Sequence, residues 1–140
     1  FEARRMVYPA LEQRADAVLT EDVCLPRQKL ADMLAEVERI GERHDTFIAN
    51  VAHAGDGNLP PLIIVAQGDE DARRRAQSAF EEIIDAALAR GGTVSGEHGV
   101  GLLKRGGMRR EQPPPVLSMQ RAIKAALDPL GILNPGKVVG

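Results

Sequence analysis

Two glycine-rich segments carry the side chains that could do chemistry. Residues 93–104 read TVSGEHGVGLLK and place Glu97 and His98 side by side between Gly96 and Gly99. Glycines on both sides of two functional groups allow the backbone to come close to a bound molecule. A carboxylate beside an imidazole can transfer a proton or bind a metal ion. The same pattern also fits an ordinary turn with two exposed polar residues.

The second segment is residues 53–59, which read HAGDGNL. His53 from this loop and Glu97 from the other could bind a divalent metal such as zinc or manganese, although a full site needs three or more protein ligands. Asp56 lies between two glycines, where aspartate is usually a turn former. Neither loop has paired histidines one helical turn apart, so spacing alone leaves both interpretations open.

Three other arrangements have less support. The glycines of GEHGVG follow the order GxxGxG, whereas a dinucleotide-binding loop has the order GxGxxG and leads into a helix. Cys24 falls in an alternating apolar segment, which favours a small buried residue over a nucleophile paired with His53 or His98. His44 follows a basic residue at a predicted helix end, where an imidazole suits the helix dipole and a structural role.

The two loops connect predicted strands and helices. Alternating or β-branched segments predict strands at residues 18–25, 46–53, 61–66 and 93–95. Apolar residues at helical spacing predict helices over residues 28–43 and from 68–69 to about 90. Residues 18–96 therefore follow the order β-α-β-β-α-β. This order predicts an α+β fold of the ferredoxin-like type, an antiparallel four-stranded sheet with helices on one face.

The flanking segments are less regular. Residues 1–14 predict a helix interrupted by Pro9, and residues 99–115 predict a loop because they contain glycines and a run of prolines. A C-terminal helix is predicted over residues 116–127, and an irregular tail over 131–140. The helix is expected to turn its apolar residues inward; these are Val116, Met119, Ile123 and Leu127.

The composition of the chain argues against several classes of function. A chain of 140 residues can form one domain with a real core. Its net charge of -2 and its 3% aromatic content argue against a nucleic-acid partner. A single cysteine, Cys24, excludes an intrachain disulfide and favours the cytoplasm, and no apolar run is long enough for a membrane span. The chain begins at Phe1 and not at methionine, so part of a longer polypeptide or a trimmed chain is expected.

Four segments together resemble one family. They read LTEDVCLPR, HAGDGNL, VSGEHGVGLLK and AIKAALDPLGILNPGK, at residues 19–27, 53–59, 94–104 and 122–137. In order and spacing they are similar to the C-terminal part of FAD-linked oxidases, the group of the glycolate oxidase FAD subunit and bacterial D-lactate dehydrogenase. The resemblance implies that residues 1–140 cap a flavin and supply substrate and metal groups. It also implies that a separate N-terminal domain, expected to be absent here, holds most of the FAD.

The resemblance also implies roles for individual residues. Such enzymes oxidise a D-2-hydroxy acid to the 2-oxo acid and pass a hydride to FAD. By motif position His53 and Glu97 match metal ligands, and His98 matches the residue that takes the hydroxyl proton. Arg4 matches an arginine that binds the substrate carboxylate, and Asn134 lies where the family's tail approaches the flavin. These roles agree with general chemistry, because a bound metal acidifies a hydroxyl and an arginine fork suits a carboxylate.

One position departs from the family pattern. The family motif is HxGDGNLH, and its second histidine is a metal ligand, whereas this chain has Pro60 there. Proline has no side-chain donor atom, so two of the three expected ligands are present. The alternative to an oxidoreductase is therefore a non-catalytic ferredoxin-like module that binds a small ligand or metal ion or forms a homo-oligomer through its sheet. As an enzyme part, this fragment alone is expected to be inactive.

Overall fold

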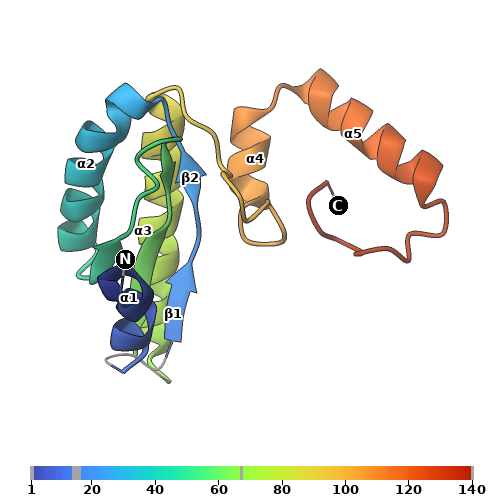
Figure 1. Ribbon diagram of the computed structural model, residues 1–140. Helices are drawn as coiled ribbons and strands as arrows, with labels where there is room; N and C mark the ends of the chain where they lie inside the picture. Colours follow the sequence, from blue (N-terminus) through green and yellow to red (C-terminus); the bar gives the residue numbers. More distant parts are fainter. Residues whose placement is uncertain (1, 14–16, 67, 140) are drawn as a thin grey trace.

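The computed structural model describes residues 2–13, 17–66 and 68–139. Its three-stranded antiparallel sheet has the order β1 (Ala17–Thr20), β5 (Pro61–Val65), β3 (Ile48–Asn50). A second antiparallel pair joins β2 (Val23–Cys24) to β4 (Asn58–Leu59). Along the chain, β2 follows β1, and β4 comes just before β5. The fold is mixed helix and strand with an antiparallel sheet, which confirms the predicted α+β class (Figure 1).

The elements follow the predicted order along the chain, but the strands do not form one continuous four-stranded sheet. The expected strand at residues 93–95 is reduced to a single bridge between Thr93 and Cys24. The expected strand at residues 18–25 divides into β1 and β2, because Asp22 between them turns its carboxylate into the protein interior. The structure therefore matches the predicted ferredoxin-like sheet only in part.

Two long helices cover one face of the sheet. They are α2 (Leu30–Arg43), preceded by the short helix η1 (Arg27–Lys29), and α3 (Glu70–Ala89). Their apolar faces meet the sheet in one core, as the helical spacing predicted. The fully or almost fully buried members of this core on the two helices are Met33, Val37, Ile40, Ala76, Ala79, Phe80, Ile83, Ile84 and Ala87.

The helix α1 (Glu2–Glu12) runs through Pro9 and is not interrupted there. It lies on the other face of the sheet, where Val7 lines a cavity together with Thr20 and Leu62. Leu62 alternates with the core residue Ile63 along β5 and therefore points to that opposite face. The prediction that two helices share one face is met by α2 and α3, while α1 adds a layer.

A short helix replaces part of the predicted loop at residues 99–115. The helix α4 (Arg105–Glu111) has two glycines near its start and little intrinsic helix propensity. Packing holds it instead: Met108 is buried, and Gly107 lies so close to α3 that a Cβ there would be 2.8 Å from Ile84. Glu111 accepts hydrogen bonds from the hydroxyl of Thr93 and the N–H of Val94. The loop prediction was wrong here because it could not include these tertiary contacts.

The C-terminal helix α5 (Pro114–Leu127) is present but does not bury its apolar stripe. Met119 is 56% exposed, Ile123 52% and Leu127 77%, so the prediction that they point inward was wrong. Leu117 is the α5 side chain that packs against the core, and α5 stands apart from α2 and α3 (Figure 1). Among the described residues, no helix is both long and apolar enough to cross a membrane.

Candidate functional site

The two glycine-rich loops lie against each other at one end of the sheet. His53 and Asn58 form an isolated antiparallel bridge, which closes the turn between them. Nε2 of His53 lies 3.4 Å from Oε1 of Glu97, and Nδ2 of Asn58 donates to the same oxygen at 3.1 Å. The structure therefore brings His53 and Glu97 together from two loops that are distant in the sequence. Asn58 and Glu97, for example, are 39 positions apart.

Close packing explains two of the glycines in these loops. A Cβ at Gly96 would lie 2.3 Å from Oδ1 of Asn58 and 2.9 Å from Oδ2 of Asp22. At Gly57 φ is +79°, and a Cβ would lie 2.0 Å from the carbonyl oxygen of Leu25. Both positions need a residue without a side chain. A larger residue at position 96 would push the two loops apart, and one at position 57 would push its loop away from the backbone at Leu25.

The residue that holds the Glu97–His98 loop is Asp22, which sequence reasoning missed. It is fully buried, and its Oδ2 accepts hydrogen bonds from the N–H groups of Glu97 (2.5 Å) and His98 (3.0 Å). Its Oδ1 accepts from Nζ of Lys104, which is also fully buried. The same Nζ donates to the backbone carbonyl of Asp22 at 2.6 Å and lies 3.3 Å from the Glu21 carboxylate.

Burial by itself would raise the pKa of Asp22. The hydrogen bonds from Lys104 and from two backbone N–H groups outweigh burial, so the pKa lies below its ordinary value. Asp22 is therefore an anion that keeps its charge and its acceptor role in the folded chain. The sequence does contain a signal for it, since aspartate is depleted in strands and here interrupts an apolar strand pattern. The matching signal for Lys104 is a lysine at the end of the apolar run GLLK.

His98 faces Asp22 through one ring nitrogen. Its Nδ1 lies 3.8 Å from Oδ1 of Asp22, and its side chain is 37% exposed. This distance is too long for a hydrogen bond, but the negative charge of the carboxylate electrostatically favours the tautomer protonated at Nδ1, in which Nε2 is the acceptor. Adjacent residues in the chain thus have different surroundings: Glu97 is turned to the His53 loop, and His98 to Asp22.

Two cavities share His53 and Glu97 in their linings. One, of about 340 Å³, is lined by Cys24, His53, Asp56, Asn58, Gly96 and Glu97. The other, of about 220 Å³, is lined by Val7, Thr20, Val51, His53, Pro60, Leu62, Glu97 and His98. His53 and Glu97 line both, so a small ligand in either cavity could reach polar and ionisable groups from both loops. Their size suits a small acid, and FAD is much larger.

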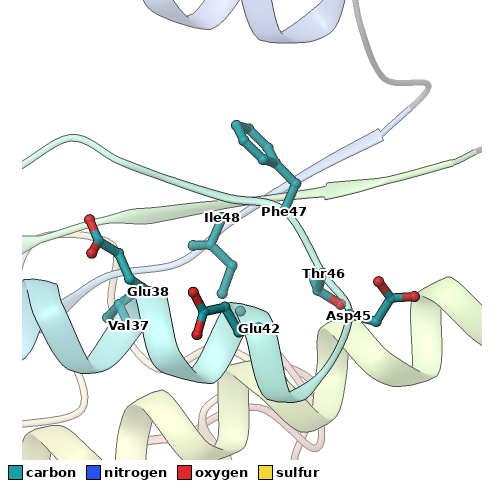
Figure 2. A pocket seen from close by; sticks show the side chains of 8 residues that line it. Val37, Glu38, Glu42, Asp45, Thr46, Phe47 and Ile48 are labelled. Carbon is teal, nitrogen blue, oxygen red and sulfur yellow. The ribbon is translucent and has the colours of Figure 1, made fainter.

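A third cavity, of about 360 Å³, lies elsewhere, between α2 and the segment that enters β3. Figure 2 shows Glu38, Glu42 and Asp45 at its rim, with Ile48 pointing toward α2 and Phe47 pointing away from it. It contains none of the predicted site residues. Acidic residues at an open rim fit a solvated surface, so the chemistry is assigned to the other cavities.

The donor set does not fit the metal site that the family resemblance implies. Pro60 lines the cavity with His53 and Glu97 but has no donor atom. Across the described ranges, no group of three His, Cys, Asp or Glu side chains is placed to hold a metal ion. One oxygen of Glu97 is already used by Asn58. Two potential ligands remain, which is fewer than protein metal sites need.

The other predicted residues are placed as follows. Asp56 accepts from the N–H of Asn58 at 3.2 Å, which agrees with a turn former. Cys24 is half-buried against the larger cavity, so it is less buried than expected, and its Sγ lies 3.5 Å from the carbonyl oxygen of Asp56. His44 lies 2.6 Å from a carboxylate oxygen of Glu82 on α3, away from both loops.

The two remaining predicted residues are Arg4 and Asn134. Arg4 is in α1, but its side chain is outside the described part of the structure. Asn134 is exposed in the tail with φ of +46°, and its Oδ1 accepts from Nζ of Lys137. The tail returns to the loop after His98, because the N–H of Val138 donates to the carbonyl oxygen of Gly101 at 2.9 Å.

Comparison with known proteins places this arrangement in one group. The family described as FAD linked oxidases, C-terminal domain, matches residues 1–138. Glycolate oxidase subunit GlcD of Bacillus subtilis is 38% identical over 137 residues, which is 98% of this chain and 29% of that protein. The GlcD subunit of Escherichia coli K12 is 35% identical over 134 residues, 96% of this chain and 27% of that protein.

A probable mitochondrial D-lactate dehydrogenase of Danio rerio is 37% identical over 118 residues, 84% of this chain and 24% of that protein. The chain thus spans less than a third of the length of these curated relatives. Its match to the family covers almost every residue, and it includes both glycine-rich loops. The chain belongs to the family of FAD linked oxidases, C-terminal domain.

Proposed function

We propose that this chain is the substrate-side part of an FAD-dependent enzyme that oxidises a small D-2-hydroxy acid, of the glycolate or D-lactate type, to the 2-oxo acid. The observation that carries the proposal is the cavity that His98 shares with His53 and Glu97. The family assignment and the names of the relatives give the reaction type. FAD, when bound, supplies the acceptor for the hydride.

His98 is the proposed general base. Because Nδ1 faces Asp22, Nε2 is the nitrogen available to take the proton from the substrate hydroxyl as the hydride leaves the adjacent carbon. The carbon–hydrogen and oxygen–hydrogen bonds break, and the carbonyl of the 2-oxo acid forms. Arg4 is proposed to bind the substrate carboxylate, since a guanidinium group can hold both oxygens.

Glu97 and His53 are proposed to hold the two loops together without binding a metal ion. Their side chains lie 3.4 Å apart, and Asn58 donates to the same carboxylate oxygen. This contact keeps Glu97 turned toward the other loop, and His98 lines the same cavity. The proposed proton transfer does not involve a metal ion, because the residue at the third ligand position, 60, is a proline.

The flavin-holding part is proposed to be another domain or a partner subunit, which would dock on the exposed side of α5 and the tail, with Asn134 at the flavin. Apolar side chains there are strongly exposed, including Leu130 at 80% and Ile132 at 69%. Large exposed apolar surfaces commonly mark interaction sites. A cytoplasmic location stays a prediction from the single cysteine, Cys24.

The test is a chimera in which residues 1–138 replace the matching segment of the Bacillus subtilis relative. We expect it to oxidise glycolate or D-lactate with a dye as electron acceptor, and L-lactate serves as the stereochemical control. His98→Ala should lower kcat/KM by roughly 10²–10⁴-fold, the usual contribution of a general base. His44→Ala is the matched control, because it also removes an imidazole but lies away from the site.

Two outcomes would contradict the proposal. One is a folded, FAD-containing chimera that oxidises neither acid, which would favour the non-catalytic binding module. The other is an equal loss of activity in His98→Ala and His44→Ala, which would show that His98 has no specific role. The chain purified alone is expected to retain no FAD.

A further inference from the structure

We propose that Asp22 and Lys104 are positioning residues for His98, acting through the backbone of the loop that carries it. The purpose assigned to them rests on the proposed function, in which His98 takes a proton from the substrate. The anchoring itself can be measured without substrate or flavin.

Asp22 and Lys104 form a fully buried ion pair. Asp22 comes from the segment before β2, and Lys104 is the residue before α4. Removing two opposite charges from water is costly, and a buried ion pair often stabilises a fold no better than apolar residues would. The pair is therefore better explained by the geometry it sets than by the stability it adds.

The Asp22 carboxylate holds the backbone of the Glu97–His98 loop. Its Oδ2 accepts from two consecutive N–H groups, those of Glu97 and His98, and its Oδ1 accepts from Lys104. Two N–H groups aimed at one oxygen fix the orientation of the peptide between them. Gly96, just before this peptide, packs against the same Oδ2 and against Asn58, so the loop has little room to move.

The same carboxylate also faces the imidazole ring of His98. The Asp22 oxygen that binds Lys104 lies 3.8 Å from Nδ1 of His98. Lys104 therefore holds the carboxylate in a position that favours a proton on Nδ1 and leaves Nε2 to act on the substrate. A carboxylate that orients an imidazole in this way is a recurring device in enzymes that use histidine as a base.

The chain offers a matched control at Asp128. Its carboxylate is also buried and accepts from two backbone N–H groups, those of Ile132 and Leu133, and from the side chain of Lys124. It holds the start of the tail in the way that Asp22 holds the Glu97–His98 loop. Asp128→Asn thus removes an equivalent charge at a different place, and it likewise replaces one accepting oxygen by an NH2 group that cannot accept.

The test uses NMR spectroscopy on the full 140-residue chain. Amide hydrogen exchange reports the anchoring of Glu97 and His98, and the nitrogen chemical shifts of the His98 ring report its tautomer. In the unaltered chain we expect both amides to exchange at least about tenfold more slowly than loop amides without a hydrogen bond, because each donates to a charged acceptor. When the imidazole ring of His98 is neutral, its single N–H proton should be mainly on Nδ1.

The variants separate positioning from general stability. Asp22→Asn should speed exchange at both amides by about tenfold or more and lower the Nδ1-protonated fraction of His98. Asp128→Asn should leave both readouts unchanged and instead speed exchange at Ile132 and Leu133. In the chimera, Asp22→Asn should lower kcat more than it raises KM, because the ring is still present but misplaced.

Lys104→Met provides a second route to the same answer. It leaves the Asp22 carboxylate buried without its cation, so it should lower the free energy of unfolding more than the double variant Asp22→Asn/Lys104→Met does. The double variant has no carboxylate beside His98, so it should lose the preference for a proton on Nδ1 as Asp22→Asn does. Amides of Glu97 and His98 that exchange as fast as unbonded loop amides in the unaltered chain would overturn the proposal, even if no variant folds. If both amides are protected but the chimera is inactive, the proposed function is refuted, while the positioning of the Glu97–His98 loop by Asp22 is still supported.

Discussion

Single residues in this site have roles that their neighbours in the chain do not share. Glu97 and His98 are adjacent, yet the Glu97 side chain contacts His53 and Asn58, while the His98 ring faces Asp22. Their backbone N–H groups converge on one carboxylate oxygen. The separation of roles therefore comes from partners in other segments, and glycine at position 96 makes room for those partners.

Substitution of Gly96 should disturb the loop that carries both residues. A Cβ at this position would lie 2.3 Å from Oδ1 of Asn58. We expect Gly96→Ala to lower the free energy of unfolding by about 1–3 kcal/mol, as overpacking usually does. Urea unfolding followed by circular dichroism measures this change. Gly55→Ala is the control, because nothing lies within 4 Å of its Cβ position, and equal losses in the two variants would contradict the packing explanation.

Position 60 is the place where a third metal ligand could be introduced. Pro60 lines the cavity with His53 and Glu97, so a histidine there would add a third donor to the same space. In a zinc titration followed by calorimetry, we expect no stoichiometric binding to the unaltered chain and one bound zinc ion in Pro60→His. Adding His53→Ala should abolish that binding, and Pro60→Leu is the control for loss of the proline. Tight zinc binding by the unaltered chain would contradict the two-ligand description.

At the scale of elements, an ion-pair network joins α2 to α3 away from the site. Arg43 on α2 binds Glu36 at 2.9 Å and Glu82 on α3 at 2.5 Å, and His44 lies 2.6 Å from the other oxygen of Glu82. The hydrogen bonds from Arg43 and then Arg39 lower the pKa of Glu36 to about 2. His44, followed by Arg43, lowers the pKa of Glu82 as well.

This network predicts a loss of stability in acid. A carboxylate whose pKa is lowered by folding contributes stability that is present above its unfolded pKa and is lost as pH falls toward its folded pKa. For Glu36 the loss should occur between its ordinary value of 4.5 and about 2. Thermal unfolding at several pH values should show a shallower acid dependence in Glu36→Gln. Glu38→Gln, on the same helix but outside the network, is the control, and an identical slope in both variants would contradict the assignment.

At the scale of the whole molecule, the chain has one well-packed body and one helix with an uncovered side. The body contains the sheet, α2, α3 and the site loops, whereas α5 reaches the core through Leu117 (Figure 1). The stripe of Met119, Ile123 and Leu127 faces solvent in this chain. A surface of this kind is consistent with the proposed docking of a flavin-holding part.

Charged substitutions on that stripe should affect docking but not folding. We expect Ile123→Asp and Leu127→Asp to leave the thermal stability of the chain alone within about 0.5 kcal/mol, because both side chains are already exposed. In the chimera the same changes should reduce FAD retention, measured by flavin absorbance after gel filtration. Arg121→Asp, on the opposite side of α5, is the control. Full FAD retention in both stripe variants would argue against this docking surface.

The sequence by itself determined the elements with strong local patterns. The apolar periodicity of α2 and α3, the alternation around β5 and the glycines of the two loops were all evident, because these signals repeat within a few residues of the chain. They predicted the α+β class correctly. The family resemblance added the reaction type and the roles proposed for His53, Glu97 and His98.

Tertiary structure decided the features that depend on distant partners. The helix α4 forms from glycine-rich sequence because it packs on α3, and the stripe on α5 stays exposed because nothing in the described chain covers it. Asp22 and Lys104 are 82 positions apart, so no local pattern could pair them. Their burial, and with it the orientation of the Glu97–His98 loop, exists only once the chain has folded, because a carboxylate and an ammonium group leave water only when each has the other as a partner.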